Sequence, residues 1–281
     1  MKKIGKEQVR KARQTLAKYK EGKAVLDKRI VSNEQWWKLR HWGEIGCDKD
    51  DTRPMPASAW LFNSLANKHA DAMDNIPEPT VLPREKSDEE VAKQLSLILP
   101  AILERCGYEK LYSDGWWYKL KNGSMCTAVV WDPDADGGMG DIAIRNADIL
   151  NLFWEPGIKD IEESANLFYV TLVDRERLNL MYPELLGEDT ESVAGGTGNV
   201  EKYKTEDKTD DSAKVEVIDW YYKKTINGRK QLCYCKFCGD RVIYSSEDDE
   251  SCADGFYKHS RYPFVMDTLF VQEGTPCGSA T

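Results

Sequence analysis

Four cysteines in the C-terminal part of the chain have the residue type and spacing that could bind a metal. Cys233, Cys235, Cys238 and Cys252 form the pattern C-x-C-x2-C-x13-C, with His259 nearby. Zinc prefers four thiolate or imidazole ligands, usually supplied by C-x2-C pairs, and only Cys235 and Cys238 have that spacing. Cys233 and Cys235 would share one face of a strand, where a cysteine behaves as a small apolar residue. Buried packing is therefore the favoured interpretation, and a zinc-stabilised binding module is the alternative.

A second segment begins like a calcium-binding loop. Residues 132–137 have the sequence DPDADG, but a calcium loop of this kind needs a bidentate acid at its twelfth position and a helix on each side. The twelfth position is Ala143, and both flanking segments have the pattern of strands. We interpret the segment as a glycine-rich turn between two strands.

Histidine is the remaining residue type that could supply a base. The chain has three, His41, His69 and His259, without a partner at a catalytic spacing. His69 falls on the apolar side of its expected helix, which predicts a hydrogen-bonded core histidine.

Motifs for nucleotide binding and hydrolysis are missing from the sequence. It contains neither a phosphate-binding G-x4-G-K-[ST] loop nor a G-x-S-x-G or H-E-x2-H motif. We therefore expect a protein that is not an enzyme, with no catalytic residues, no cofactor and no bound metal.

The elements that must position these residues change in kind along the chain. Apolar residues from Val9 onward recur every three or four positions, which predicts an amphipathic helix or a pair of helices, with Lys23 interrupting the apolar seam. A new helix is expected after Ser32, where Gln35 completes a capping box. The other expected helices are 57–75, 88–105 and a short one at 175–186; the expected strands are 115–121, 124–131, 141–145, 167–173, 215–225, 231–238, 241–246 and 264–271.

This order predicts an α+β fold in which an N-terminal helical segment packs with a mostly antiparallel β region. We divide the chain into a helical region at 1–107 and a β-rich region with a short helix at 108–186. An acidic flexible loop at 187–213 and a β-meander at 214–281 follow. Leu95–Leu103, the longest apolar run, is interrupted by Pro100 and is too short to cross a membrane. The N-terminus lacks the pattern of a secretory signal.

Charge is distributed unevenly over the chain. Residues 1–31, a basic N-terminal arm, hold eleven Lys or Arg and three acidic residues, a local charge of +8. The whole chain carries −9, so the remainder carries −17. An acidic body repels nucleic-acid phosphate, which argues against a protein whose body grips DNA. The arm is interpreted as a solvated helix face, with binding to an acidic partner or RNA as the alternative.

Tryptophan is unusually frequent. The chain has nine, and aromatic residues are enriched where subunits meet. Trp36, Trp37 and Trp42 lie together on one expected helix, and we take them as candidates for subunit packing. This composition favours a subunit of an assembly.

Several stretches in a consistent order resemble the N-terminal half of tailed-bacteriophage portal proteins with a P22-like or SPP1-like core. The likeness runs from about residue 12 to residue 276. The stretches are Asn33–Trp42 (NEQWWKLRHW), 57–75, Asn75–Arg84 (NIPEPTVLPR), Gly140–Gly157 (GDIAIRNADILNLFWEPG) and Gly255–Phe270 (GFYKHSRYPFVMDTLF).

The resemblance implies a structural subunit, or a fragment of one, in a portal ring of usually twelve copies. The ring would sit at one vertex of the capsid in the virion and would be assembled in the cytoplasm of the bacterial host. Double-stranded DNA would pass through it, without sequence-specific binding, during packaging and ejection. Expected partners are other copies of the chain, the terminase large subunit, a head-completion or adaptor protein, and the scaffold or capsid protein, with no membrane. Family members continue into channel-lining stem helices and a clip segment; because this chain ends at Thr281, we expect it to supply mainly the wing-like region.

Overall fold

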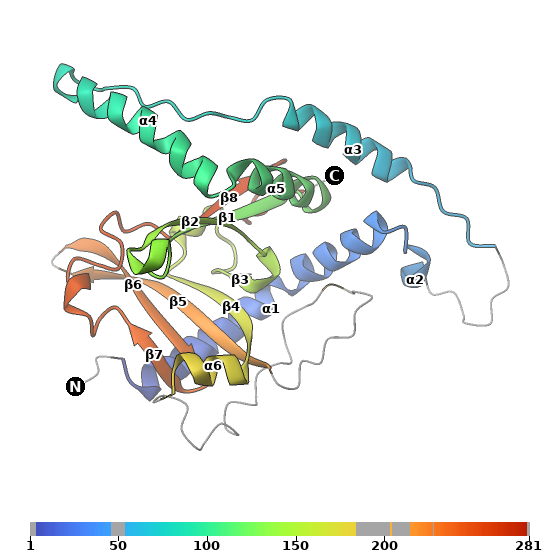
Figure 1. Cartoon of the computed structure of the whole chain (residues 1–281). Helices are drawn as coiled ribbons and strands as arrows, with labels where there is room; N and C mark the ends of the chain where they lie inside the picture. The colour runs from blue at the N-terminus through green and yellow to red at the C-terminus, as the bar shows by residue number, and fades with distance from the viewer. Residues whose placement is uncertain (1–3, 46–53, 184–202, 204–213, 227, 280–281) are drawn as a thin grey trace. The chain divides into compact units, whose positions relative to one another are not determined.

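The computed structural model describes residues 4–45, 54–183, 203, 214–226 and 228–279 (Figure 1). It divides into two compact units, each assembled from separate segments of the chain. Unit 1 contains residues 1–35, 148–262 and 272–276, and unit 2 contains residues 36–147, 263–271 and 277–281. Helices accompany an antiparallel sheet in each unit, so the α+β fold is confirmed.

Unit 1 is built on a five-stranded antiparallel sheet, sheet B, with the strand order β3-β4-β5-β6-β7. The neighbouring strands pair in register; Trp220 of β5, for example, lies opposite Phe168 of β4 and Cys235 of β6. The expected strands at 167–173, 215–225, 231–238 and 241–246 are confirmed. The bounds are β3 Leu152–Phe153, β4 Asn166–Asp174, β5 Lys214–Ile226, β6 Arg229–Cys238 and β7 Arg241–Ser245, and helix α6 spans Arg175–Met181.

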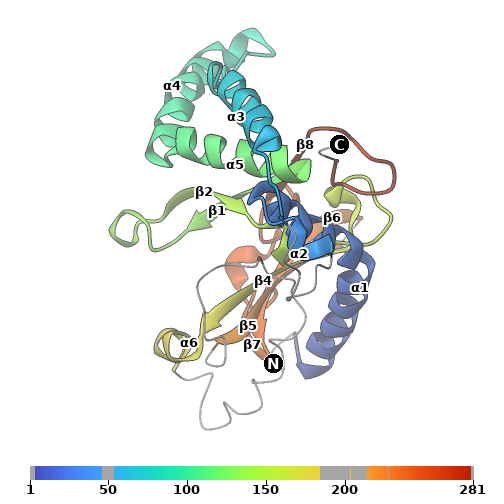
Figure 2. The ribbon, with the colours of Figure 1, turned by 90° about the vertical axis from the view of Figure 1, so that its right-hand side faces the viewer.

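The long first helix, α1 (Lys6–Trp37), covers one face of sheet B. Its buried residues Val9, Ala12, Leu16 and Tyr19 follow the expected helical spacing and join a core cluster with Phe168 and other residues of the sheet. Among the described residues, the basic segment at 1–31 is therefore part of a core helix, and most of its basic side chains lie on the exposed side of that helix. Figure 2 shows α1 running along the sheet.

The expected new helix after Ser32 is wrong, because α1 continues without a break to Trp37. Lys23 does not interrupt the seam. Its ammonium is buried, lies 2.8 Å from the Asp27 carboxylate one turn later and donates to the carbonyl oxygen of Ile149 at 2.5 Å. The apolar side of the helix therefore extends past Lys23 to Ile30.

Unit 2 is built on a three-stranded antiparallel sheet, sheet A, with the strand order β2-β1-β8. The bounds are β1 Ser124–Asp132, β2 Asp141–Ala147 and β8 Phe264–Thr268. The helices of this unit are α2 Trp42–Ile45, α3 Trp60–Met73, α4 Glu89–Arg105 and α5 Tyr108–Asn122. Short 3-10 turns occur at Lys86–Asp88 and Asp136–Gly138 here, and at Ile149–Asn151, Ile161–Glu163 and Glu250–Cys252 in unit 1.

The expected strand at 115–121 is wrong, because these residues belong to helix α5. Gly115, Lys119 and Asn122 are buried at spacings of four and three, which is the period of a helix face. Gly123 ends this helix. It has a left-handed φ of 81°, and its N–H donates to the carbonyl oxygen of Lys119.

The DPDADG segment forms the turn between β1 and β2, as expected. The Asp132 carboxylate pairs with Arg145 at 2.5 Å and also accepts the N–H of Asp134. The Asp132 carboxylate therefore stabilises the local turn. The predicted acidic loop at 187–213 lies outside the described residues, apart from Tyr203, whose hydroxyl lies 3.4 Å from Asp148.

Candidate assembly surface

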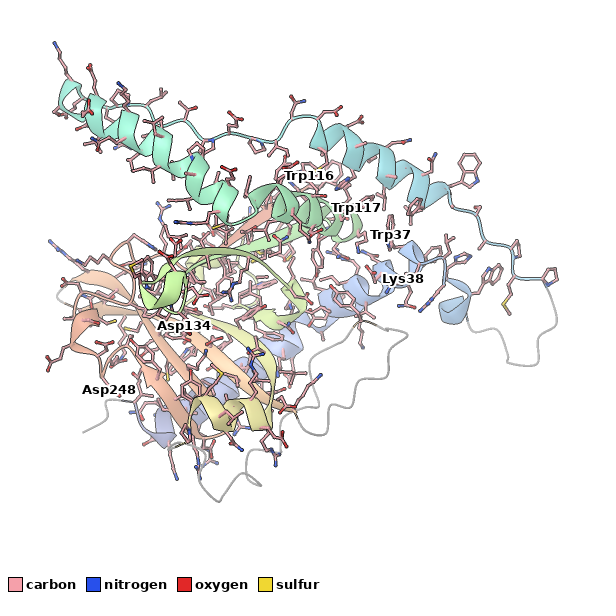
Figure 3. The ribbon with its side chains drawn as sticks, in the orientation of Figure 1. Trp37, Lys38, Trp116, Trp117, Asp134 and Asp248 are labelled. Carbon is pink, nitrogen blue, oxygen red and sulfur yellow. The ribbon has the colours of Figure 1, made fainter. Side chains whose placement is uncertain are left out.

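Trp37, one of the three candidates for subunit packing, is the last residue of α1 and contacts two helices of unit 2. Its ring centroid is 4.8 Å from that of Phe62 in α3 and 5.3 Å from that of Trp117 in α5. The ammonium of Lys121 lies 5.7 Å from the same ring. Figure 3 shows Trp37 and Trp117 turned toward each other. Trp37 thus packs within its own chain.

His69 supports this aromatic junction from α3. Its ring stacks on Trp117 at 4.0 Å with an interplanar angle of 11°, and its Nε2 lies 3.1 Å from the carbonyl oxygen and from the hydroxyl of Ser113. The predicted hydrogen bond is confirmed. The side chain is only half-buried, however, so the expected core position is not found; none of the residues of α3 is fully buried.

Trp36 lies in the last turn of α1, and Trp42 begins α2 after the turn that follows. Trp36 is 44% exposed and stacks on His41 at 5.1 Å. Trp42 contacts the same histidine at 5.4 Å and donates its indole N–H to the carbonyl oxygen of Pro56. Lys38, Leu39 and Arg40 between them are exposed. We call Trp36, Lys38, Leu39 and Arg40 the basic turn.

The apolar face of α4 is larger than its own unit covers. Ala92 and Ser96 face the chain; Ala92 is buried, and the Ser96 hydroxyl bridges the N–H and the carbonyl oxygen of Val81. A second apolar row lies beside them: Val91 is 56% exposed, Leu95 41% and Ile98 50%. We call these three residues, together with half-buried Ile102, the α4 seam.

The α4 seam was missed from the sequence, although a signal for it is there. Its members follow one another at spacings of four, three and four, the a/d spacing of a helix that packs against another helix. In the sequence, the apolar run Leu95–Leu103 appears continuous because both the covered face of α4 and the α4 seam are apolar. Only the structure separates the covered face from the uncovered one.

Cys233, Cys235 and Cys238 do not converge on one point, although Cys252 lines the same cavity as Cys233. Cys233 and Cys235 of β6 lie in the core cluster under α1, whereas Cys238 lies in the cluster of Leu178 and Val215. Cys235 and Cys238 are three residues apart on a strand that pairs with β5 without a break, so their side chains point to opposite faces. The C-x2-C pair is therefore split between the two faces of sheet B, and residues on opposite faces cannot hold one zinc ion. Among the described residues, no group of three or more His, Cys, Asp or Glu side chains could hold a metal.

Burial also keeps these thiols protonated. It raises the pKa of Cys235 to about 12 and that of Cys238 to about 11. Nearby carboxylates, Glu247 for Cys235 and Glu216 for Cys238, act in the same direction. Because the thiolate is the form that binds metal and attacks electrophiles, these cysteines act as apolar packing residues.

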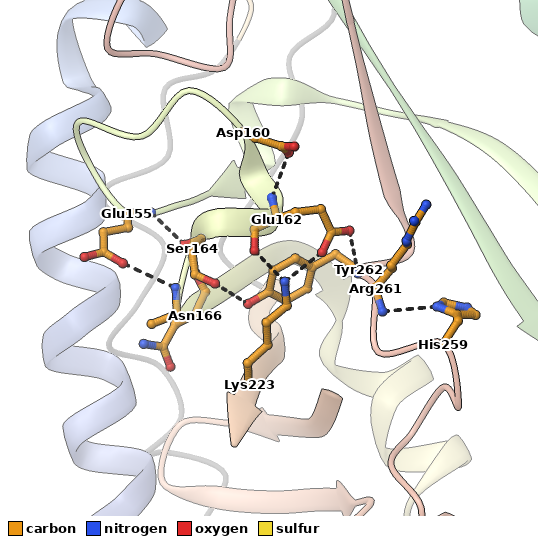
Figure 4. Close-up of polar contacts among 10 residues, drawn as sticks. Glu155, Asp160, Glu162, Ser164, Asn166, Lys223, His259, Arg261 and Tyr262 are labelled. Carbon is orange, nitrogen blue, oxygen red and sulfur yellow. Dashed lines mark hydrogen bonds and ion pairs between the residues drawn. The ribbon is translucent and has the colours of Figure 1, made fainter. Parts of the chain in front are cut away.

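A polar network in unit 1 brings together groups that could in principle do acid–base chemistry (Figure 4). The ammonium of Lys223 pairs with the Glu162 carboxylate at 2.7 Å and lies 4.2 Å from the ring of Tyr262. The Tyr262 hydroxyl donates to the carbonyl oxygen of Ser164 at 2.7 Å, and burial raises its pKa. These contacts tie the segment before β8 to the start of β4, so the network holds the fold together.

Exposed apolar rows on a folded α+β scaffold are typical of a subunit of a larger assembly. The comparison with protein families agrees: the sequence model of the phage P22-like portal proteins matches residues 70–259. This chain belongs to the phage P22-like portal protein family. No curated protein matches the chain.

Membership in this family places the chain among structural proteins of phages, which form oligomeric rings and are components of the capsid. Among the helices of the described residues, none combines the length and the apolar character that crossing a membrane requires.

Proposed function

We propose that this chain is a subunit, or a fragment of a subunit, of the portal ring at one vertex of the capsid. The ring is the conduit through which double-stranded DNA enters during packaging and leaves during ejection. It also provides the platform on which the terminase large subunit and a head-completion or adaptor protein dock, and it meets the scaffold or capsid protein during assembly. The match to the portal family over residues 70–259 carries this proposal.

Charge and aromatic content support the same function. The net charge of −9 disfavours a lasting grip on DNA, which suits a conduit through which the duplex must slide. Trp36, exposed in the last turn of α1, remains the tryptophan that we propose for contact with a neighbouring subunit. Trp37 and Trp42 would hold that turn in place, because both are engaged within the chain.

Self-association tests the proposal. The purified chain should sediment as a concentration-dependent oligomer, and negative-stain electron microscopy of it or of a longer relative should show annular particles. A chain that stays monomeric at micromolar concentration, together with longer relatives that form no rings, would overturn the proposal. In the phage genome, a terminase gene upstream and a capsid gene downstream are expected.

A further inference from the structure

The α4 seam is the part of unit 2 that most needs a partner. Val91, Leu95, Ile98 and Ile102 form one row along the helix, and the a/d spacing of that row suits a second element that packs alongside it. The row is continuous with the covered face of α4, which is held by the contact between Ser96 and Val81. The seam is thus presented on a helix whose other side is fixed.

The N-terminal end of this seam is acidic on balance, because residues 86–93 hold three acidic residues and two exposed lysines, Lys86 and Lys93. Asp88, Glu89 and Glu90 are consecutive and exposed, and Asp88 and Glu90 fall on either side of Val91 on the helix surface. A partner that covers the seam and also stabilises these carboxylates must combine apolar side chains with basic ones.

The basic turn has that combination. Trp36 and Leu39 supply exposed apolar surface, and Lys38 and Arg40 supply positive charge. Leu39 has a left-handed φ of 59°, which turns the chain sharply directly after α1 and puts these side chains at a corner. In Figure 1, α4 and α2, which directly follows the basic turn, lie at opposite ends of unit 2.

We propose that the α4 seam and its acidic end dock on the basic turn of a second copy of this chain. Two unlike surfaces of one chain that fit each other make a head-to-tail contact, and such contacts close into rings when the rotation per subunit allows it. This inference rests on the proposed ring and names one of its contacts. The complementary charge at the two surfaces favours a second copy over a different protein.

Charge reversal at both surfaces tests the contact. Sedimentation velocity over a concentration series would compare the wild-type chain with Asp88→Lys/Glu90→Lys, with Lys38→Glu/Arg40→Glu, and with the variant that combines all four changes. Each double reversal brings like charges together and should weaken self-association at least about tenfold. The combined variant restores opposite charges and should recover most of that loss.

Apolar variants test the seam itself. Leu95→Asp and Ile98→Asp should each weaken self-association, with unchanged circular dichroism because both side chains are exposed. Leu180→Asp is the matched control: Leu180 is strongly exposed on α6 of unit 1, outside the proposed contact, so this change should leave association unaltered.

The outcomes separate this inference from the proposed function. If the wild-type chain associates but the seam variants associate equally well, or if the combined charge variant stays as weak as the double reversals, another protein or solvent covers the seam and the contact is wrong. A wild-type chain and longer relatives that never associate overturn the ring and the contact together.

Discussion

At the scale of single residues, Lys23 shows what a sequence pattern cannot resolve. A lysine within an apolar row predicts an interruption, because an unpaired charge is costly to bury. Here the side chains of Lys23 and Asp27 are only 4% and 6% exposed and pair with each other, and the ammonium also lies 4.5 Å from the Phe153 ring. The i,i+4 spacing of the pair was visible in the sequence, but its burial depends on the loop that carries Ile149.

Removing one member of this pair should destabilise the protein strongly. Lys23→Met or Asp27→Asn leaves a charge buried without its counter-ion, which we expect to cost about 3–5 kcal/mol in the free energy of unfolding. The combined Lys23→Met/Asp27→Leu variant should be much closer to wild type. Urea denaturation followed by circular dichroism measures these differences.

The exposed pair Glu7–Lys11 on the same helix has the same spacing and serves as a control. Lys11→Met should change stability little, because exposed ion pairs contribute little. Equal losses from Lys11→Met and Lys23→Met would show that burial is not the cause.

Asp219 should make the stability of unit 1 depend on pH. Burial raises its pKa, although Tyr234 donates a hydrogen bond to it at 2.5 Å and Lys236 lies 3.5 Å away. A carboxyl with a raised pKa in the folded state binds its proton more tightly there than in the unfolded chain. Its contribution to stability is therefore present at low pH and is lost as the pH rises through the folded pKa.

The variant Asp219→Asn measures this dependence. Its free energy of unfolding, relative to wild type, should increase as the pH rises from acidic to neutral, because only the wild-type side chain becomes charged. Denaturation curves over that pH range give the difference. A difference that stays constant with pH, or that falls, would contradict the assignment.

At the scale of elements, the sequence predicted the strands well where apolar and polar residues alternate regularly. The strands of sheet B were predicted from alternation and turn residues, since their side chains divide between two faces. The strand predicted around Trp116 was wrong, because adjacent aromatic residues do not distinguish the period of a helix from that of a strand. Gly115 lets helix α5 pack closely on β1, because a Cβ at this position would lie 2.8 Å from the Met125 sulfur.

Trp36 and Trp37 are neighbours on α1 and should behave differently when replaced. Trp37→Ala removes contacts with Phe62 and Trp117 and should lower the free energy of unfolding by about 3 kcal/mol. Trp36→Ala removes an exposed side chain and should leave stability nearly unchanged while it weakens self-association.

Thermal denaturation and sedimentation measure these two effects separately. Equal losses of stability in the two variants would argue against the different positions of the two side chains. A Trp36→Ala variant with wild-type self-association would remove Trp36 from the proposed contact.

At the scale of the whole molecule, the sequence predicts regions that follow one another along the chain. Each compact unit instead combines three separate segments. The division at residues 107, 186 and 213 stays a prediction. Unit 1 combines the first 35 residues with residues 148–262, and strand β8 returns to complete sheet A of unit 2. The pairing of β8 with β1 leaves no pattern in the local sequence, because it joins two strands that are far apart along the chain. The candidate tryptophans could be found from sequence; the distinction between the engaged Trp37 and the exposed Trp36 could not.

The net charge of −9 predicts how the whole chain behaves toward DNA. In an electrophoretic mobility shift assay at physiological salt, we expect no binding to duplex DNA tighter than about 0.1 mM, because non-specific affinity comes from phosphate neutralisation. A basic DNA-binding protein is the positive control. Micromolar binding that is lost when the exposed lysines of α1 are replaced would show that the local +8 of the first 31 residues outweighs the acidic remainder.

The position of β8 also determines when sheet A can be completed during translation. Lys119 at the end of α5 pairs with Asp267 of β8, which the ribosome adds 148 residues later. Until then, one edge of β1 has no strand beside it and can pair with other nascent chains. All of residues 148–262 emerge in that interval, so the β-rich part of unit 1 is synthesised while unit 2 is still incomplete.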